Sequence, residues 1–220
     1  MPIRVLVVDD EALVRHALRV FISSDSRTTL IGEAVDGHDA ISQCEERRPD
    51  VVVMDIHMRG MNGIDATAAI ARGFPEVKVL ALTTFSSERY VVAALRAGAS
   101  GYLVKDTVPD ALVTAVVDVH EGRSALSPQI SRSLISAVHG SQNDTVTDTA
   151  KLVSMPALTE RELSIVQLLA RGASNAEIAH ELYLSEATIK ANFTRIMAKW
   201  GVRDRVQVLI LAAQEKYVSL

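Results

Sequence analysis

The sequence predicts two domains: an α/β domain with a doubly wound, five-stranded parallel sheet, then an all-helical domain of four helices. The first 120 residues or so alternate short apolar runs with helical segments. Residues 140–150, GSQNDTVTDTA, lack apolar periodicity, as is typical of a linker. The last 60 residues are helical throughout, with repeated N-cap signals.

Five runs rich in Val, Leu and Ile predict the strands, since each is too short for a helix. They are Arg4–Val8, Leu30–Ala34, Val51–Met54, Lys78–Leu82 and Gly101–Val104. Helical segments follow them at Leu13–Ile22, Gly37–Glu46, Gly63–Ala71, Glu88–Ala97 and Pro109–His120. Helices on both faces bury a parallel sheet, and five strand–helix units match a flavodoxin-like domain.

The helices of the C-terminal part have well-marked starts. Capping-box spacing joins Thr159 to Glu162, Ser174 to Glu177 and Asp204 to Gln207, and Ser185 is a further N-cap candidate. We expect helices at about 160–171, 175–182, 186–200 and 204–216. The predicted domains are therefore 1–122 and 157–220, joined by a linker at 123–156 that includes a helix near 128–138.

The composition is that of an ordinary globular protein, with 48 % hydrophobic and 23 % charged residues. No segment approaches the roughly 20 apolar residues of a membrane helix, and the N-terminal region lacks the features of a secretory signal. The single Cys44 cannot form an internal disulfide, which fits a reducing compartment. We therefore expect a cytoplasmic protein that does not enter a membrane.

The net charge of −4 is unevenly distributed along the chain. Residues 1–122 hold 12 basic and 18 acidic residues, whereas residues 159–220 hold 8 basic and 7 acidic residues. An acidic first part and a slightly basic last part indicate two units with different partners.

Five chemically active side chains follow the ends of the predicted strands: Asp9, Asp10, Asp55, Thr83 and Lys105. Open α/β sheets build their sites at this edge. Three crowded carboxylates suit a hard cation such as Mg²⁺, and a carboxylate can accept a phosphoryl group. A single Asp at a strand end is often only a helix cap, but the coincidence of all five favours a phosphoacceptor site at Asp55, with Lys105 and Thr83 contacting the product.

Residues 175–200 predict two helices joined by a short turn. The second has an apolar face of Ile189, Phe193, Ile196 and Trp200, and the opposite side carries Ala187, Ala191, Thr194 and Ala198. Small residues with polar and basic neighbours suit a helix that enters a DNA groove. An ordinary amphipathic surface helix is the alternative, because the net charge of this part is small.

Two sets of motifs resemble known families. The segments VLVVDDEALVR, VVVMDIHMRGMNG, VLALTTF and AGASGYLVKD resemble the receiver domain of response regulators over about residues 3–120. The segment LTERELSIVQLLARGASNAEIAHELYLSEATIKANFTRIMAKWGVRDRVQVL is similar to the LuxR-type helix-turn-helix over about 157–214. Together they resemble the NarL/FixJ class of bacterial two-component response regulators, which implies a transcription regulator controlled by a sensor histidine kinase and not a turnover enzyme.

For the first domain, the resemblance implies that Asp55 is the phosphoacceptor and that Asp9, Asp10, Asp55 and the main-chain carbonyl of His57 hold Mg²⁺. Thr83 and Tyr102 match the family's switch pair. Three positions depart from the family pattern: Arg59 and Asp106 stand where Pro is usual, and Asn62 where Asp is usual. We expect Arg59 to alter the loop beside the site and the rate of phosphoryl loss.

For the second domain, the resemblance implies DNA contacts from the helix at 186–200. We expect Lys190, Ala191 and Thr194 to contact base edges. Thr188, Asn192 and Lys199 are expected to contact phosphates. Asn192 and Trp200 replace the His and Leu that many members have. The last helix, with Val206, Leu209, Ile210 and Ala213, is expected to pair two subunits, so that a homodimer binds two half-sites of an operator. Alternatively, this helix only closes the core.

Two other functions stay open at this point. An Mg²⁺-dependent phosphohydrolase also uses an Asp nucleophile, but the DNA-binding part argues against it. A receiver that is gated by a ligand instead of by phosphorylation is disfavoured by the complete acidic site. Nucleotide binding has less support, because no Gly-rich phosphate loop follows the first strand.

Overall fold

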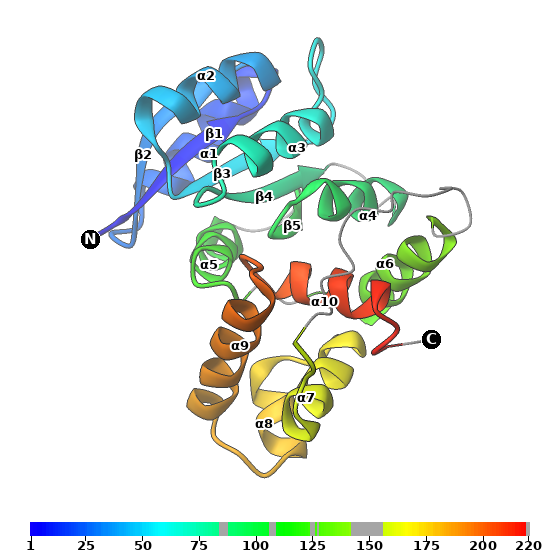
Figure 1. Cartoon of the computed structure of the whole chain (residues 1–220). Helices are drawn as coiled ribbons and strands as arrows, with labels where there is room; N and C mark the ends of the chain where they lie inside the picture. Colours follow the sequence, from blue (N-terminus) through cyan, green and yellow to red (C-terminus); the bar gives the residue numbers. More distant parts are fainter. Residues whose placement is uncertain (84–87, 106–108, 124–125, 127, 142–155, 219–220) are drawn as a thin grey trace. The chain divides into compact units, whose positions relative to one another are not determined.

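The computed structural model describes residues 1–83, 88–105, 109–123, 126, 128–141 and 156–218, and of residues 83, 109, 110 and 141 only the main chain. The chain forms two compact units, Met1–Ser124 and Ala125–Leu220 (Figure 1). Among the helices of these residues, none combines the length and the apolar character needed to cross a membrane.

The first unit is built on a five-stranded sheet in which every strand pairs in parallel with its neighbours. Its strands are β1 (Ile3–Val8), β2 (Thr28–Ala34), β3 (Val51–Asp55), β4 (Lys78–Thr83) and β5 (Gly101–Val104), in the order β2-β1-β3-β4-β5. The predicted doubly wound sheet is thus confirmed, and each predicted strand lies within two residues of the observed bounds.

Alternate residues of the strands build two separate cores, because successive side chains point to opposite faces. Val5 and Val7 of β1 face one core, which α1 (Ala12–Ser23) and α5 (Pro109–His120) cover. Leu6 and Val8 face the other, which α2 (Gly37–Arg47) and α3 (Gly63–Gly73) cover. The remaining helix, α4 (Glu88–Ala97), packs beside α3, β4 and β5 (Figure 1).

The strand order creates a switch point between β1 and β3. From β1 the chain continues to β2 on one side, and β3 then pairs with the other side of β1. The crevice at the carboxyl ends of such neighbouring strands is where this architecture places its ligands. Because Val8 pairs with Met54, the residues that follow them, Asp9 and Asp55, emerge next to each other at this crevice.

The second unit is entirely helical over the residues that the structure describes. It comprises α6 (Pro128–Ser141), α7 (Glu160–Ala170), α8 (Asn175–Glu181), α9 (Glu186–Trp200) and α10 (Arg205–Gln214). The four predicted C-terminal helices are therefore present. Sequence analysis assigned α6 to the linker, but it packs against α10 and α7 and buries Leu134 and Ile135. The predicted boundaries at 122 and 156 stay predictions.

The predicted N-caps explain where the helices of the second unit begin. Thr159 and Ser174 each form a complete capping box, with Glu162 and Glu177 respectively. The Ser185 and Asp204 side chains each accept a hydrogen bond from the main-chain N–H three residues further on, and so cap α9 and α10.

Candidate functional site

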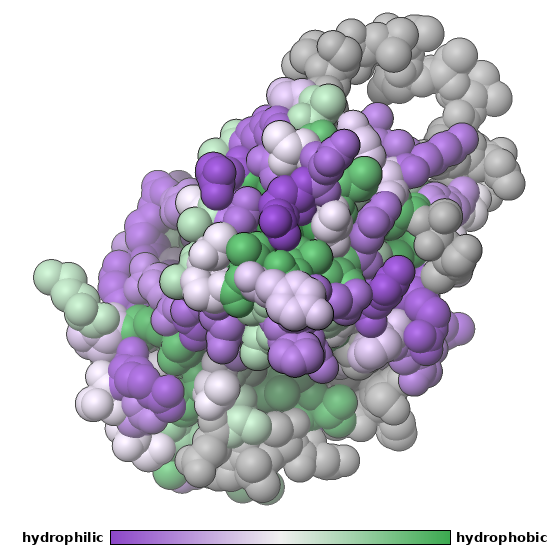
Figure 2. All heavy atoms as spheres, turned by 90° about the horizontal axis from the view of Figure 1, so that it is seen from below, coloured by the Kyte–Doolittle hydropathy of each residue, from purple (hydrophilic) through white to green (hydrophobic). Residues whose placement is uncertain are grey.

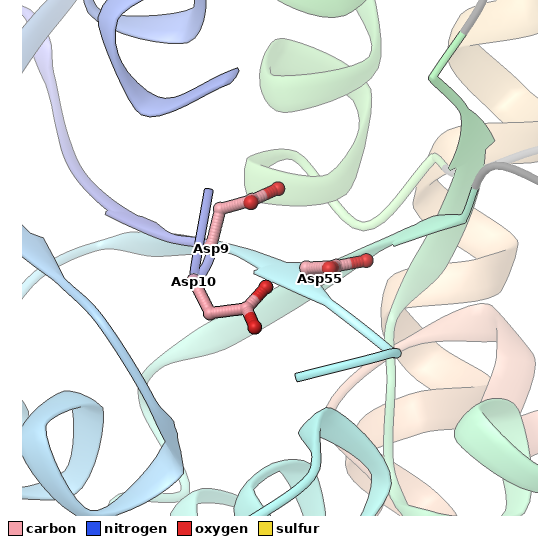
Figure 3. A group of neighbouring side chains, drawn as sticks. All are labelled: Asp9, Asp10 and Asp55. Carbon is pink, nitrogen blue, oxygen red and sulfur yellow. The ribbon is translucent and has the colours of Figure 1, made fainter. Parts of the chain in front are cut away.

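Three carboxylates meet at the switch point of the sheet (Figure 3). Asp9 and Asp10 directly follow β1, and Asp55 is the last residue of β3. One oxygen from each carboxylate lies within 4.8 Å of the other two. Asp9 and Asp55 are buried, whereas Asp10 is half-buried. A compact set of carboxylate oxygens is the ligand set that Mg²⁺ prefers, so the residues present fit this ion.

Lys105 provides a cation inside this cluster. It directly follows β5, and its Nζ lies 2.6 Å from Oδ2 of Asp9 and 3.1 Å from Oδ2 of Asp55. The side chain is only 10 % exposed, so the two ion pairs are shielded from water. Residues that are 96 and 50 positions apart from Lys105 are therefore brought within ion-pair distance by the parallel strand ends.

Burial and charge act in opposite directions on these groups. Burial raises the pKa of the Asp55 carboxyl, and the neighbouring Asp9 adds to this effect, while Lys105 only partly offsets them. Burial also opposes the charged form of Lys105, but its hydrogen bonds and charge interactions with Asp9 and Asp55 outweigh burial and raise the pKa of Lys105. Lys105 is consequently an ammonium group at neutral pH.

Gly63 allows α3 to begin directly against the strand that carries Asp55. Its N–H donates a hydrogen bond of 3.1 Å to the carbonyl of Ile56. A Cβ at this position would lie 1.9 Å from the main-chain oxygen of Asp55, so any larger residue would displace the end of β3. Asn62, a departure from the family pattern, caps α3 by accepting from the N–H of Asp65 at 2.9 Å.

Arg59 contacts the cluster from the loop between β3 and α3. Its Nε lies 3.2 Å from Oδ2 of Asp10, and its main-chain N–H donates to the same oxygen at 3.3 Å. The Arg59 side chain is 91 % exposed. Sequence analysis recognised the position as unusual but missed this pair. The available signal was a cation in the loop that starts at the acidic edge of the sheet.

The other predicted residues of this site are less fully defined. The His57 ring is exposed and lies edge-on to Tyr90, with the ring centroids 4.6 Å apart, and the main chain of His57 hydrogen-bonds the Asp55 carboxylate. Tyr102 is half-buried in β5. The side chain of Thr83 and all of Asp106 lie outside the described residues. The roles of Thr83 and Tyr102, and metal binding by the His57 carbonyl, stay predictions.

In the second unit, α9 has the two faces that the sequence predicts. The buried face is formed by Ile189, Phe193, Ile196 and Trp200. The exposed residues are Glu186, Ala187, Lys190, Ala191, Thr194, Arg195 and Ala198. Figure 2 views the molecule from the side on which α7, α8 and α9 are drawn, and shows hydrophilic residues around a smaller hydrophobic group. The exposed face of α9 is thus a ridge of small side chains flanked by Lys190 and Arg195.

Two predicted phosphate contacts of α9 are engaged within the chain. Asn192 is 5 % exposed; its Nδ2 donates to the carbonyl of Thr188 at 2.8 Å, and its Oδ1 accepts from Arg195 at 3.3 Å. This burial argues against a phosphate contact for Asn192, because its polar atoms already have partners. Lys199 is partly exposed, and its Nζ pairs with Glu162 at 2.8 Å.

The predicted dimer residues of α10 need a correction. Val206, Leu209 and Ala213 are fully buried within the chain, and only Ile210 of this set keeps exposed surface. Packing of α6 against α10 contributes to this burial, and the ring of His139 hydrogen-bonds the carbonyl of Ala213 at 2.9 Å. Side chains without exposed surface cannot contact a second subunit in this conformation. Sequence analysis missed that α6 packs on α10.

Comparison with known proteins places both units in families. The model of the response regulator receiver domain matches residues 5–117, and that of the bacterial regulatory proteins of the luxR family matches residues 156–212. The chain is 37 % identical to the transcriptional regulatory protein YxjL of Bacillus subtilis, over 99 % of this chain and 98 % of that protein. The chain is a NarL/FixJ-family response regulator.

Other relatives share the full arrangement. This response regulator is 34 % identical to the response regulator VraR of Staphylococcus epidermidis over the whole of both chains. Its structure is similar to that of the response regulator ChrA of a heme-sensing two-component system, with a TM-score of 0.51, 37 % identity and 99 % of each chain covered. The response regulator is thus a transcriptional regulator with a LuxR-type DNA-binding domain and not a turnover enzyme, which sets the phosphohydrolase alternative aside.

Proposed function

We propose that a cognate sensor histidine kinase phosphorylates this response regulator on Asp55, and that phosphorylation controls its binding to DNA. The observation that carries the proposal is the position of Lys105, whose ammonium group bridges Asp9 and Asp55 at 2.6 and 3.1 Å beside Asp10. In this arrangement the Asp55 carboxylate provides the nucleophile, and the buried ammonium group of Lys105 provides a fixed positive charge beside it.

The chemistry is an in-line phosphoryl transfer. An oxygen of Asp55 attacks the phosphorus of the kinase's phosphohistidine, the new P–O bond forms as the P–N bond breaks, and the histidine leaves with the bonding electrons. Asp10, Asp55 and the His57 carbonyl, with Asp9 in support, would hold Mg²⁺, which would supply neutralising charge for the phosphoryl oxygens. Lys105 exchanges its carboxylate contacts for phosphoryl oxygens, and the Thr83 hydroxyl donates to another.

The phosphorylated state changes a surface of the first domain. Movement of Thr83 toward the phosphoryl group leaves room into which the half-buried ring of Tyr102 turns. The changed surface biases the protein toward a homodimer. Two α9 helices then bind two half-sites of an operator, with Lys190, Ala191 and Thr194 at base edges and Thr188 and Lys199 at phosphates. Of the predicted dimer residues we retain only Ile210, because the other three are buried within the chain.

Phosphoryl labelling tests the phosphoacceptor. Incubation of the full chain with Mg²⁺ and acetyl phosphate carrying a phosphorus label should give one acyl phosphate, which is unstable to alkali. Asp55→Ala should remove the label, and Asp65→Asn, which changes an exposed carboxylate on α3, should keep it. Equal labelling of Asp55→Ala and the wild type would end the assignment.

DNA binding needs a separate test, because it depends on the other unit. Genome-wide footprinting with and without phosphodonor should show paired half-sites that are occupied more fully after phosphorylation. Footprints that do not respond to the phosphodonor would contradict the coupling while leaving the DNA-binding assignment intact.

A further inference from the structure

The pair between Arg59 and Asp10 joins a positive side chain to one of the three acids at the switch point. Both hydrogen bonds from Arg59, one from Nε at 3.2 Å and one from the main chain at 3.3 Å, end on Oδ2 of Asp10. Of the three carboxylates, Asp9 and Asp55 are already bridged by Lys105. Arg59 therefore engages the acid that Lys105 leaves free, and the three negative charges face two positive side chains.

A cation that binds at this cluster competes with the guanidinium group. Mg²⁺ takes oxygen ligands at close range, and a carboxylate oxygen that accepts two N–H donors has fewer lone pairs left for a metal. The positive charge of Arg59 also repels a divalent ion that approaches Asp10. Both effects lower the affinity of the site for the ion, and both are consequences of the residue at position 59.

We propose that Arg59 is a tethered competitor of Mg²⁺ at Asp10, and that it sets the cation concentration at which Asp55 becomes phosphorylated. The inference rests on the proposed function, because it assumes that the acids bind Mg²⁺. Arg59 acts as a positioning residue: it touches neither the phosphodonor nor the phosphoryl group, and it changes the occupancy of the metal site and not the transfer step.

The exposure of the Arg59 side chain limits how strongly it can weaken Mg²⁺ binding. With 91 % of its side chain exposed, the guanidinium can move into water when the ion arrives, and no buried packing has to be broken. Exposed ion pairs of this kind contribute little to stability. We expect removal of the charge to strengthen Mg²⁺ binding roughly three- to tenfold at low ionic strength, and less at high salt, where charges are screened.

The test measures Mg²⁺ binding directly, by titration calorimetry of the full unphosphorylated chain with MgCl₂. Arg59→Gln removes the charge but keeps the main-chain donor, Arg59→Pro removes both, and Arg59→Lys keeps the charge. Arg72→Gln is the matched control, because it removes an exposed cation from the last turn of α3. The eleven residues of α3 separate the two ends of that helix by about 15 Å, beyond the roughly 10 Å screening length at 0.1 M salt.

The expected result is a lower dissociation constant for Arg59→Gln and Arg59→Pro, with Arg59→Lys and Arg72→Gln close to the wild type. The Mg²⁺ concentration for half-maximal labelling with acetyl phosphate should fall by the same factor, while the labelling rate at saturating Mg²⁺ stays unchanged. Circular dichroism checks that each variant is folded.

Two results would overturn the inference. Equal dissociation constants for Arg59→Gln and the wild type would show that the guanidinium does not compete. A lower saturated labelling rate, at an unchanged Mg²⁺ requirement, would place Arg59 on the phosphodonor instead. If the wild type neither bound Mg²⁺ nor became labelled, the proposed function itself would fail. If the wild type bound Mg²⁺ and became labelled, and Arg59→Gln did so with the same constants, only this inference would fail.

Discussion

The buried carboxylate of Asp55 costs folding free energy, although the proposed function requires it. This carboxylate is buried beside the negative charge of Asp9, and Lys105 offsets only part of that cost. In the proposed function this arrangement favours reaction of Asp55 with a phosphoryl group, because the carboxylate is poorly solvated and faces a fixed cation. Functional residues commonly reduce stability in this way.

We predict that Asp55→Asn stabilises the first domain in the absence of divalent cations. The pKa of Asp55 is raised in the folded state above the 3.8 of a free Asp, so its ionisation costs folding free energy. The wild type should therefore lose stability as the pH rises from 3.8 through the raised pKa, and Asp55→Asn should not. At neutral pH we expect a gain of roughly 1 kcal/mol in the unfolding free energy.

Urea unfolding with a chelator present, between pH 4 and pH 7, measures this difference. Glu45→Gln, which removes an exposed carboxylate from α2, is the control and should leave the pH profile unchanged. A loss of stability in Asp55→Asn across the whole range would contradict the electrostatic explanation.

Gly63 shows that a residue without a functional group can be essential for the site. We predict that Gly63→Ala destabilises the first domain by roughly 3 kcal/mol, because its Cβ would lie 1.9 Å from the main chain of Asp55. Gly73, at the other end of α3, is the matched control: no atom lies within 4 Å of a Cβ there. Gly73→Ala should be neutral or slightly stabilising in the same denaturation assay. Similar losses for both variants would mean that the close contact is not the cause.

At the scale of elements, α9 is held by contacts that leave its outer face free. Lys199 pairs with Glu162, the capping-box residue of α7, at 2.8 Å. Trp200 is the last residue of α9, and its indole N–H donates to the carbonyl of Pro156 at 3.1 Å. The first interaction joins the C-terminal end of α9 to α7, and the second joins it to the segment that precedes α7. The side chains that contact DNA in our proposal are therefore carried by a rigid element.

We predict that Lys190→Ala weakens operator binding by about 1–3 kcal/mol, the value for a lost base contact, without changing thermal stability. Lys190 is exposed, so its removal leaves the core of the helical unit intact. Asn192→Ala should behave in the opposite way: it should lower stability and change affinity little, because Asn192 is buried. Gel-shift titrations at fixed salt measure both, with Arg132→Ala on α6 as the control for loss of one exposed cation. An unchanged affinity of Lys190→Ala would exclude the contact.

At the scale of the whole molecule, the chain folds as two compact units, and the second buries side chains of its own, such as Ile165 and Ile178. All three acids lie in the first unit, and Trp200, the single tryptophan of the chain, lies in the second. A ligand that binds only the folded form of one unit stabilises that unit.

We predict that Mg²⁺ raises the stability of the first unit alone. At an ion concentration one hundred times its dissociation constant, the gain should be about 2.7 kcal/mol. Circular dichroism reports on the unfolding of both units, whereas Trp200 fluorescence reports on that of the second. Mg²⁺ should therefore shift the unfolding transition of the first unit, which circular dichroism detects, and leave the transition in Trp200 fluorescence unchanged. An equal shift in Trp200 fluorescence would show that the two units unfold together.

The sequence predicts most of this architecture, because the decisive signals are local. Strands and helices follow from the spacing of apolar residues, and caps such as Thr159 and Ser174 mark helix starts. The meeting of Asp9, Asp55 and Lys105 also follows, once the strands are known to be parallel. The pair of Arg59 with Asp10 could not be predicted, because it depends on the path of one loop. Burial of Asn192 and of α10 depends on helix packing, which periodicity alone does not specify.

The small residues on the outer face of α9 have a consequence for engineering. Ala187, Ala191 and Ala198 project no atom beyond Cβ and are exposed, so larger side chains can be introduced there without disturbing the hydrophobic interior. If α9 enters the DNA groove as proposed, variation at these positions should change which promoters the protein binds and leave its first domain unaltered. The helix is thus a suitable starting point for building new genetic circuits.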